Sequence, residues 1–231
     1  MNSFPSGFRA LIIGSSGGIG GAFADLLHQN PQCGHVERLH RHSQPPIDFD
    51  LEESIAEAAA QSGRQARFHL IINAVGVLHA AGAMPEKKLA DLNYRQMLDT
   101  FRINTMGPAM ILRHFSPLLD SQRSVMAVLS AKVGSIGDNR LGGWYSYRSS
   151  KAALNMLLKT ASIEMKRSNP NAVLVSLHPG TVVSKLSGPF AGAQAARPAA
   201  EAARDMLGVI DSLSPANSGQ FYAYNGDQLP W

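Results

Sequence analysis

A glycine-rich loop follows the first apolar run of the chain. The run is Ala10-Leu11-Ile12-Ile13, and the loop is Gly14-Ser15-Ser16-Gly17-Gly18-Ile19-Gly20, within which a helical pattern begins. In such a strand–loop–helix unit, Gly14 allows a tight turn, Gly18 a close approach of the backbone to a ligand, and Gly20 close packing of the helix on the sheet. Free amides at the helix start would face anionic groups. The loop therefore predicts a site for the phosphates of a nucleotide.

Strand and helix patterns alternate along the whole chain. The strand-like runs are continuous and apolar, and they cover Phe8–Ile13, His35–His40, Phe68–Asn73, Ser124–Ser130 and Ala172–His178, with short additional runs at Ile47–Phe49 and Gly219–Tyr222. The helical patterns cover Ile19–Gln29, Glu52–Gln61, Tyr94–Phe115, Tyr147–Lys166 and Ala199–Ser212. Continuous apolar strands between helices are typical of a parallel sheet that is covered on both faces. The repeated order implies right-handed crossovers and an α/β fold.

The chain is expected to form one domain. Its 231 residues are 45% hydrophobic, which is enough to bury a full core, and they contain no internal repeat and no linker. We therefore predict a single dinucleotide-binding catalytic domain over residues 1–231. The stretch Ser184–Pro198 is rich in Gly, Ala and Ser and holds two prolines. It is predicted to be a loop or lid on the substrate side.

Composition excludes several other classes of protein. No apolar run reaches about 18 residues, and the N-terminus lacks a basic and apolar leader, so neither a membrane span nor a secretion signal is expected. The single cysteine, Cys33, fits a reducing cytoplasm. The net charge is +4, but Lys and Arg are scattered, so no nucleic acid partner is predicted. No Cys or carboxylate completes a ligand set around His35, His40 and His42, so no metal is predicted.

Tyr147 and Lys151 form the second informative pattern. They lie four residues apart in Tyr-Arg-Ser-Ser-Lys, inside a predicted helix. Residues at i and i+4 share one face of a helix, so a phenol and an ammonium can meet over one ligand. This pair predicts an acid–base site beside the nucleotide site.

These motifs together resemble the short-chain dehydrogenase/reductase family, over nearly the whole chain. The resemblance is carried by the glycine loop, by Asn73-Ala74-Val75-Gly76, by Asn104 in a long helix, by Tyr147-x-x-x-Lys151, and by Pro179-Gly180 after a strand. The segments Val133–Ile136, Gly143–Arg148 and Leu177–Thr181 are similar to the carbonyl-reductase-like branch, which includes C-factor and sniffer proteins. The resemblance implies a Rossmann-type doubly wound sheet of about seven strands in the order 3-2-1-4-5-6-7, with three helices on each face.

In such a family Tyr147 would be the general acid–base. Its reference pKa of about 10 would have to fall to near 7, which requires about 4 kcal/mol. A unit positive charge about 4 Å away supplies that order of energy in a partly screened site, and Lys151 is the expected source. Lys151 is also expected to bond the ribose hydroxyls of the cofactor. The resemblance further implies that Asn104 kinks its helix and holds a water in a proton relay to Lys151.

The serine that polarises the carbonyl in this family is missing from its usual position, which falls on Ala131. Ser130 is adjacent, but neighbouring strand residues point to opposite faces unless a bulge or turn brings the side chain round. Ser135 is a second candidate. We place Ser130 in the catalytic set, and expect Ser130→Ala to lower turnover more than Ser135→Ala.

The end of the second strand favours NADP over NAD. An NAD site needs a carboxylate about 20 residues past the glycine loop. That place holds Leu39-His40-Arg41-His42, where Arg41 can bind a 2′-phosphate with its planar set of donors. The resemblance implies that Asp50 and Leu51 lie at the adenine, with Asp48 as an alternative to Asp50. The predicted cofactor site consists of Gly14, Ser16, Gly18, Ile19, Gly20, Arg41, Asp50, Leu51, Asn73, Ala74, Gly76, Tyr147, Lys151, Pro179, Gly180, Val182 and Ser184.

The sequence thus predicts a cytoplasmic NADP(H)-dependent oxidoreductase that interconverts an aldehyde or ketone and an alcohol. A second hypothesis is an NAD(P)-binding signalling or regulatory protein of C-factor type with weak or no turnover. His79, Met84, Trp144 and Phe190 are candidates for the wall of the substrate pocket. Relatives pair the helices around Tyr94–Phe115 and Tyr147–Lys166, so a homodimer or homotetramer is expected.

Overall fold

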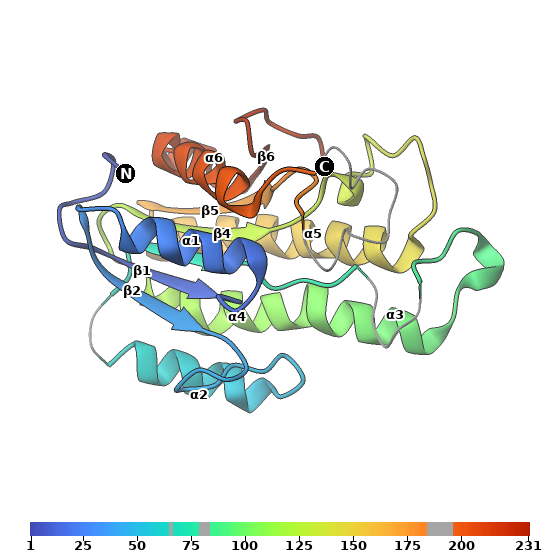
Figure 1. Cartoon of the computed structure of the whole chain (residues 1–231), viewed down its shortest axis with the longest axis horizontal. Helices are drawn as coiled ribbons and strands as arrows, with labels where there is room; N and C mark the ends of the chain where they lie inside the picture. Colours follow the sequence, from blue (N-terminus) through green and yellow to red (C-terminus); the bar gives the residue numbers. More distant parts are fainter. Residues whose placement is uncertain (65–66, 79–83, 184–195) are drawn as a thin grey trace.

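Six parallel strands form one sheet in the order β2-β1-β3-β4-β5-β6 (Figure 1). The structure is a computed structural model and describes residues 1–64, 67–78, 84–183 and 196–231. The strands are β1 (Phe8–Ile13), β2 (Cys33–Leu39), β3 (Leu70–Asn73), β4 (Ser124–Leu129), β5 (Ala172–His178) and β6 (Gln220–Ala223). The predicted α/β, Rossmann-type doubly wound sheet is confirmed.

Helices cover both faces of the sheet (Figure 1). One face carries α1 (Gly18–His28) and α6 (Ala199–Ser212), and the other carries α2 (Glu52–Ser62), α4 (Gly107–Phe115) and α5 (Tyr145–Ser168). Within the described ranges, the face of α1 and α6 therefore has two of the three helices that were predicted for it.

Alternate residues of each strand supply the two halves of the core. In β1, Ala10 and Ile12 pack against α1 and α6, whereas Leu11 and Ile13 pack against the helices of the other face. Every residue of β4 is buried, as expected for a central parallel strand between two helical layers. The parallel pairing of β1 with β3 and of β3 with β4 brings the carboxyl ends of these strands together at one edge of the sheet, where βα loops can form a site.

The prediction of a seventh strand at Ile47–Phe49 is wrong. Pro45 and Pro46 precede this segment, and proline has no N–H to donate to a sheet. The amide of Ile47 donates to the His40 carbonyl at 3.1 Å, and the amide of Asp48 donates to Ser54 Oγ at 2.9 Å. The segment packs on α4 instead, where a β-carbon at Gly107 would overlap the ring of Phe49. The observed strand order is the predicted one without this edge strand.

The long helix predicted over Tyr94–Phe115 contains a π-helical turn. It consists of α3 (Tyr94–Phe101), the π turn Arg102–Met106 and α4. Single π turns inside helices are frequent at functional sites. Asn104 lies in the middle of this turn, so the mid-helix Asn singled out in the sequence marks a real irregularity.

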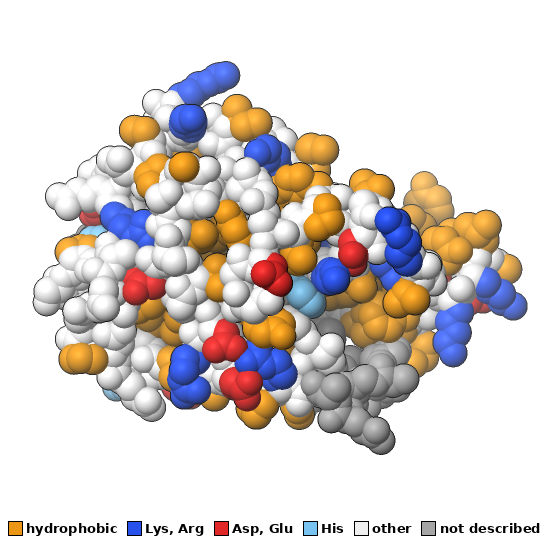
Figure 2. Space-filling model, turned by 90° about the horizontal axis from the view of Figure 1, so that it is seen from above, with side chains coloured by type: hydrophobic (Ala, Val, Ile, Leu, Met, Phe, Trp, Pro, Cys, Tyr) orange, Lys and Arg blue, Asp and Glu red, His pale blue; other side chains and the backbone are white. Residues whose placement is uncertain are grey.

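Charged side chains of both signs are interspersed on the face of the molecule that Figure 2 shows. Among the ion pairs of the described residues are Arg38 with Asp25 at 2.7 Å and Arg113 with Glu52 at 3.2 Å. In the part of the chain that the structure describes, no helix combines the length and the apolar character needed to cross a bilayer.

Candidate active site

The glycine loop joins β1 to α1 at the carboxyl edge of the sheet. Gly14 has a φ of +86°, and its amide donates to the Leu39 carbonyl at 2.8 Å. A β-carbon at Gly20 would overlap the carbonyl oxygen of Gly14, so only glycine fits there. Helix α1 begins at Gly18 with no side-chain cap and no acid in its first turn. Its first amides have no partner within the helix, and they form a place for an anion.

A cavity of about 280 Å³ opens beside this loop. It brings together six of the predicted cofactor residues, namely Gly14, Ser16, Arg41, Asp50, Ala74 and Gly76, together with the alternative Asp48. Gly18, Ile19, Gly20, Leu51 and Asn73 are not part of its lining. Asn73 is buried at the end of β3, where its Oδ1 accepts from the Val75 amide at 3.1 Å and its Nδ2 has no partner among the described residues. This buried donor lacks a hydrogen-bond acceptor, which a bound ligand or water can supply.

Arg41 lies exposed at the rim of this cavity, immediately after β2. The nearby carboxylate of Asp50 is already paired, because Arg102 Nε lies 2.9 Å from Asp50 Oδ1. An NAD site would hold an acid near the end of β2, and this chain has the cationic side chain of Arg41 there.

Lys151, Asn104 and Gly76 converge next to the cavity. A β-carbon at Gly76 would lie 3.2 Å from Lys151 Nζ and 3.5 Å from Asn104 Oδ1. Lys151 is 3% exposed, and its Nζ donates to the Leu129 carbonyl at 3.0 Å. The side chain of Asn104 accepts from the Val77 amide at 2.8 Å and donates to the Val77 carbonyl at 2.7 Å and to Ser150 Oγ at 3.1 Å. Asn104 thus ties the loop after β3 to α5.

The protonation of Tyr147 and Lys151 differs from the sequence-based expectation. Burial raises the pKa of Tyr147 to about 12, and burial lowers the pKa of Lys151 to about 8. Both shifts favour the neutral forms, because a poorly solvated site disfavours charge. The protein alone therefore keeps the phenol protonated at neutral pH, and it does not show the lowered pKa that the sequence predicted.

Ser130 and Ser135 are both buried and both engaged in hydrogen bonds. Ser130 Oγ donates to Asn155 Oδ1 at 2.7 Å, which turns the hydroxyl toward α5, and Ser135 Oγ accepts from the Asp138 amide at 3.1 Å. Ala131 follows β4 and is 7% exposed. Asn155, the partner of Ser130, lies one helical turn from Lys151, because it is four residues further along α5.

The segment after β5 approaches the same edge of the sheet. Gly180 has a φ of +75°, and a β-carbon there would lie 2.9 Å from the ring of Tyr224. Val182 is buried and forms a bridge with Arg197. Ser184, His79 and Phe190 lie outside the described residues, as does most of the predicted loop Ser184–Pro198. Of the other two candidates for the pocket wall, Met84 is exposed, and Trp144 contacts the Tyr147 ring edge to face.

Glu86, which is buried, and His178, which is half-buried, were not assigned to the site from the sequence. Glu86 is 2% exposed, and its carboxylate accepts from the amide and the hydroxyl of Ser146. His178, at the end of β5, has a pKa lowered to about 4 by burial and by the positive charge of Lys132. Glu86 stands before two lysines, where an acid is usually solvated, so nothing in the local pattern indicated that it is buried. Among the described residues, no three His, Cys, Asp or Glu side chains gather as metal ligands.

A glycine loop of this kind, at the carboxyl edge of a doubly wound parallel sheet, defines a Rossmann-type nucleotide-binding protein. A sequence model of the short chain dehydrogenase family matches residues 9–195. The chain therefore belongs to the short-chain dehydrogenase family and is an oxidoreductase, as predicted.

Two relatives in sequence and two in structure support this membership. The chain is 39% identical over 144 residues to the C-signal protein of Myxococcus xanthus, which covers 62% of this chain and 83% of that protein. It is 32% identical over 188 residues to the 1-hydroxy-2-glutathionyl-2-methyl-3-butene dehydrogenase of Rhodococcus sp. (strain AD45), which covers 81% of this chain and 80% of that protein. The NADPH-bound carbonyl reductase from chicken fatty liver matches with a TM-score of 0.82 and 25% identity over 99% of this chain and 100% of that chain. The carbonyl reductase Sniffer of D. melanogaster matches with the same TM-score at 23% identity, over 99% of this chain and 100% of that chain, and shows the shared fold.

Proposed function

We propose that this enzyme reduces an aldehyde or ketone to an alcohol with NADPH, or catalyses the reverse oxidation with NADP. The observation that carries the proposal is the convergence of Lys151, Asn104 and Gly76 beside a cavity that also contains Arg41. Bound NADPH would supply the hydride. The NADPH-bound carbonyl reductase from chicken fatty liver supports the choice of cofactor. An NADP-bound short-chain dehydrogenase/reductase from Burkholderia multivorans, at 21% identity, shares the fold.

The residues around the cavity suit a dinucleotide phosphate. The open N-terminus of α1 offers amides to the pyrophosphate, and Arg41 offers a planar set of donors to the 2′-phosphate. Asp50 or Asp48 and the neighbouring Leu51 would contact the adenine, and Asn73, Ala74 and Gly76 the adjoining ribose. Pro179, Gly180, Val182 and Ser184 are proposed to flank the nicotinamide.

Tyr147 would donate the proton that the substrate oxygen needs during reduction. A phenol with a pKa of about 12 is protonated at neutral pH, which is the form a donor requires. A lysine with a pKa of about 8 is still mainly an ammonium at pH 7, and Lys151 uses one of its three donors on the Leu129 carbonyl. The remaining donors are available to ribose hydroxyls. Asn104 would hold the relay water, and Ser130 remains our proposed carbonyl-polarising serine.

The test is NADPH consumption by the purified protein with a panel of aldehydes and ketones, for the native chain and for Tyr147→Phe. Loss of the acid should lower kcat by about 10³-fold while NADPH binding is retained, because general acid–base groups contribute on that order. A matched control is Tyr94→Phe, since Tyr94 is 84% exposed at the start of α3. Turnover that survives Tyr147→Phe would contradict the proposed chemistry.

The second candidate is a regulatory protein that binds NAD(P) and turns over little. It is favoured by the 39% identity to the C-signal protein and by Ala131 at the usual serine position. The same assay separates the two hypotheses. NADPH binding with no turnover on the whole panel, unchanged by Tyr147→Phe, would favour the regulator.

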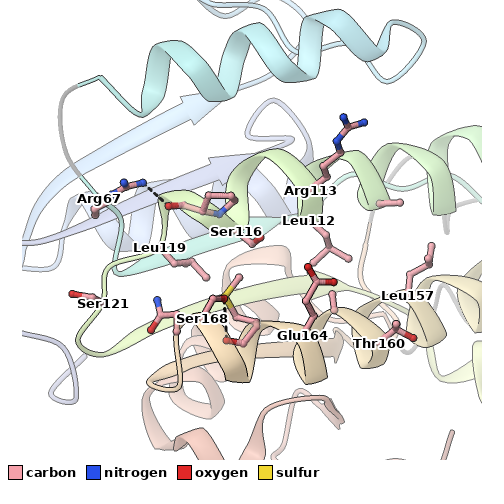
Figure 3. Close-up of a pocket in the computed structure, with 15 residues that line it drawn as sticks. Arg67, Leu112, Arg113, Ser116, Leu119, Ser121, Leu157, Thr160, Glu164 and Ser168 are labelled. Atoms are coloured by element: carbon pink, nitrogen blue, oxygen red, sulfur yellow. Dashed lines mark hydrogen bonds between the residues drawn. The ribbon is translucent and has the colours of Figure 1, made fainter.

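We also propose that the chain forms a homodimer or homotetramer through α4 and α5. A groove of about 800 Å³ lies between these helices, with Leu112, Leu157 and Glu164 among its lining residues (Figure 3). Met156 and Ile163, on the same helix α5, are 67% and 56% exposed. Apolar side chains left open on a helix face suit burial against a second copy. Light scattering on Ile163→Glu should report a smaller particle than the native chain, and an unchanged mass would contradict this interface.

A further inference from the structure

The turn before α5 has an unusual backbone. Gly142, Gly143 and Trp144 follow one another with φ values of 62°, 65° and 52°. Trp144 is the one non-glycine residue with a positive φ among the residues that the structure describes. Side chains with a β-carbon rarely adopt this region, and such residues persist where their surroundings hold them in place. The turn therefore needs contacts from outside itself.

The Arg148 side chain and the backbone carbonyl of Glu86 hold this turn. Arg148 on α5 donates from Nε to the Gly143 carbonyl at 2.9 Å and from Nη1 to the Val133 carbonyl at 3.1 Å. Its Nη2 also donates to the Gly142 carbonyl at 3.0 Å. The Trp144 amide donates to the Glu86 carbonyl at 2.5 Å. The carbonyls of the turn are thus bound by Arg148, and its last amide is bound by Glu86.

Glu86 also caps the N-terminus of α5 with its side chain. Its Oε2 accepts from the Ser146 amide at 3.2 Å, and its Oε1 accepts from Ser146 Oγ. A carboxylate is a strong acceptor for the free amides of a helix start, and it also favours the positive end of the helix dipole. Glu86 is 2% exposed and lies 60 residues before Ser146 in the chain, so the cap comes from a distant segment.

The capped turn leads directly to Tyr147. Ser146 is its immediate neighbour, and the ring of Trp144 lies 6.2 Å from the Tyr147 ring at an angle of 69°, an edge-to-face contact. Edge-to-face aromatic pairs have a preferred geometry, so a displaced indole would displace the phenol with it.

We infer that Glu86 is a positioning residue that sets the pose of Tyr147 through Ser146 and Trp144. Glu86 is not a catalytic residue, because it is held by the helix start and not by the reacting groups. The inference rests on the proposed function only where turnover is the readout, since the pose of Trp144 can be measured in the protein without any reaction.

The kinetic test compares Glu86→Ala with Glu86→Gln. The alanine removes both acceptors, and we expect kcat to fall by about 100-fold with KM for NADPH unchanged, because a misplacement of about 1 Å costs that order of rate. The glutamine can accept from the Ser146 amide and donate to Ser146 Oγ, so it should keep kcat within about threefold of the native chain. Glu53→Ala, at an exposed Glu on α2, is the matched control.

Two outcomes of the kinetic test would overturn the inference. Native kcat in Glu86→Ala would show that the cap does not position the phenol. Equal losses in Glu86→Gln and Glu86→Ala would show that the negative charge acts, and not the geometry of the acceptors. If Glu86→Ala does not fold, Ser146→Ala replaces it, because it removes one donor to Glu86 and leaves the backbone unchanged; native kcat in Ser146→Ala would then overturn the inference.

The fluorescence of Trp144 provides a readout that does not depend on turnover. The sequence has two tryptophans, so Trp231→Phe isolates Trp144. In that background Glu86→Ala should shift the Trp144 emission to longer wavelength, whereas Glu86→Gln and Glu53→Ala should not. An unshifted emission in Glu86→Ala would overturn the inference. If the native chain reduces no carbonyl but this shift occurs, the proposed function fails and the positioning of Trp144 by Glu86 stands.

Discussion

Helices α1 and α5 both begin after a glycine-rich turn, but their N-termini are used differently. The first turn of α1 has no side-chain cap and no acid, and its N-cap residue, Gly17, lines the cavity beside the glycine loop. The first turn of α5 is closed by the carboxylate of Glu86, which is supplied by the protein itself. Both helices carry the same positive end of a dipole, yet only α1 leaves it open to an external anion.

The difference explains what each helix presents to a ligand. An open helix start presents its backbone amides, which suit phosphate groups of any nucleotide. At the start of α5 the Ser146 amide is bound by Glu86, and the helix presents the side chains of Tyr147 and Lys151. The two ends therefore divide the site into a part that binds through the backbone and a part that acts through side chains.

Closing the N-terminus of α1 should give the largest effect on cofactor binding. Gly18→Asp places a carboxylate there, and it has room, because a β-carbon at Gly18 would meet only Ala199 Cβ at 4.0 Å. The charge would compete with a phosphate for the amides and repel it, and about 3 kcal/mol of repulsion corresponds to a loss of about 100-fold in NADPH affinity. Isothermal titration calorimetry measures this loss directly.

Gly18→Asn is the control for that experiment, since it has the same size and no charge. The aspartate should also raise the melting temperature slightly, because an acid in the first helical turn is stabilising by about 0.5 kcal/mol. Equal affinities for the aspartate and asparagine variants would show that α1 does not bind the phosphates.

Arg41 should give the next largest effect, and it acts on the same side as α1. We expect Arg41→Ala to lower kcat/KM for NADPH by about 30-fold, because a charge-assisted hydrogen bond contributes about 2 kcal/mol. The value for NADH should change little, since NADH has no 2′-phosphate. Steady-state kinetics with both cofactors gives the ratio of kcat/KM for NADPH to that for NADH. Equal losses of kcat/KM for the two cofactors would show that Arg41 does not discriminate between them.

The short motifs in both parts of the site were the easier features to predict from the sequence. The glycine loop has a fixed spacing along the chain, and so does the Tyr147–Lys151 pair, so both can be recognised without knowing the fold. The strand order could also be predicted, because alternating strands and helices allow few topologies. The edge strand failed for a local reason, since the amides of Ile47 and Asp48 donate to the His40 carbonyl and to Ser54 Oγ and not to a neighbouring strand.

The support of the catalytic helix could not be predicted in the same way. Glu86 acts on Ser146 across 60 residues, and no periodicity relates the two positions. The protonation of Tyr147 was also beyond the sequence, because desolvation depends on what packs around the ring. Interactions that form only through tertiary packing leave no spacing to recognise.

The charge state of Lys151 on α5 can be tested through the pH dependence of the free energy of unfolding, where the expected effect is the smallest. The pKa of Lys151 is lowered to about 8 in the folded protein, whereas the unfolded chain retains the ordinary value of 10.5. Between these values the unfolded chain binds more protons, so the free energy of unfolding should increase with pH. The expected gain is about 1 kcal/mol between about pH 8 and pH 9, measured by urea denaturation.

Lys151→Met should remove this gain, and the difference between the two proteins isolates Lys151 from other groups that titrate in the same range. Above about pH 10 the free energy of unfolding of the native chain should instead decrease with pH. The pKa of Tyr147 is raised to about 12, so the folded protein then binds more protons than the unfolded chain. A stability that is flat with pH in the native chain would mean that Lys151 is well solvated. The side-chain part of the site would then be as open to water as the N-terminus of α1, and the contrast between the two helices would disappear.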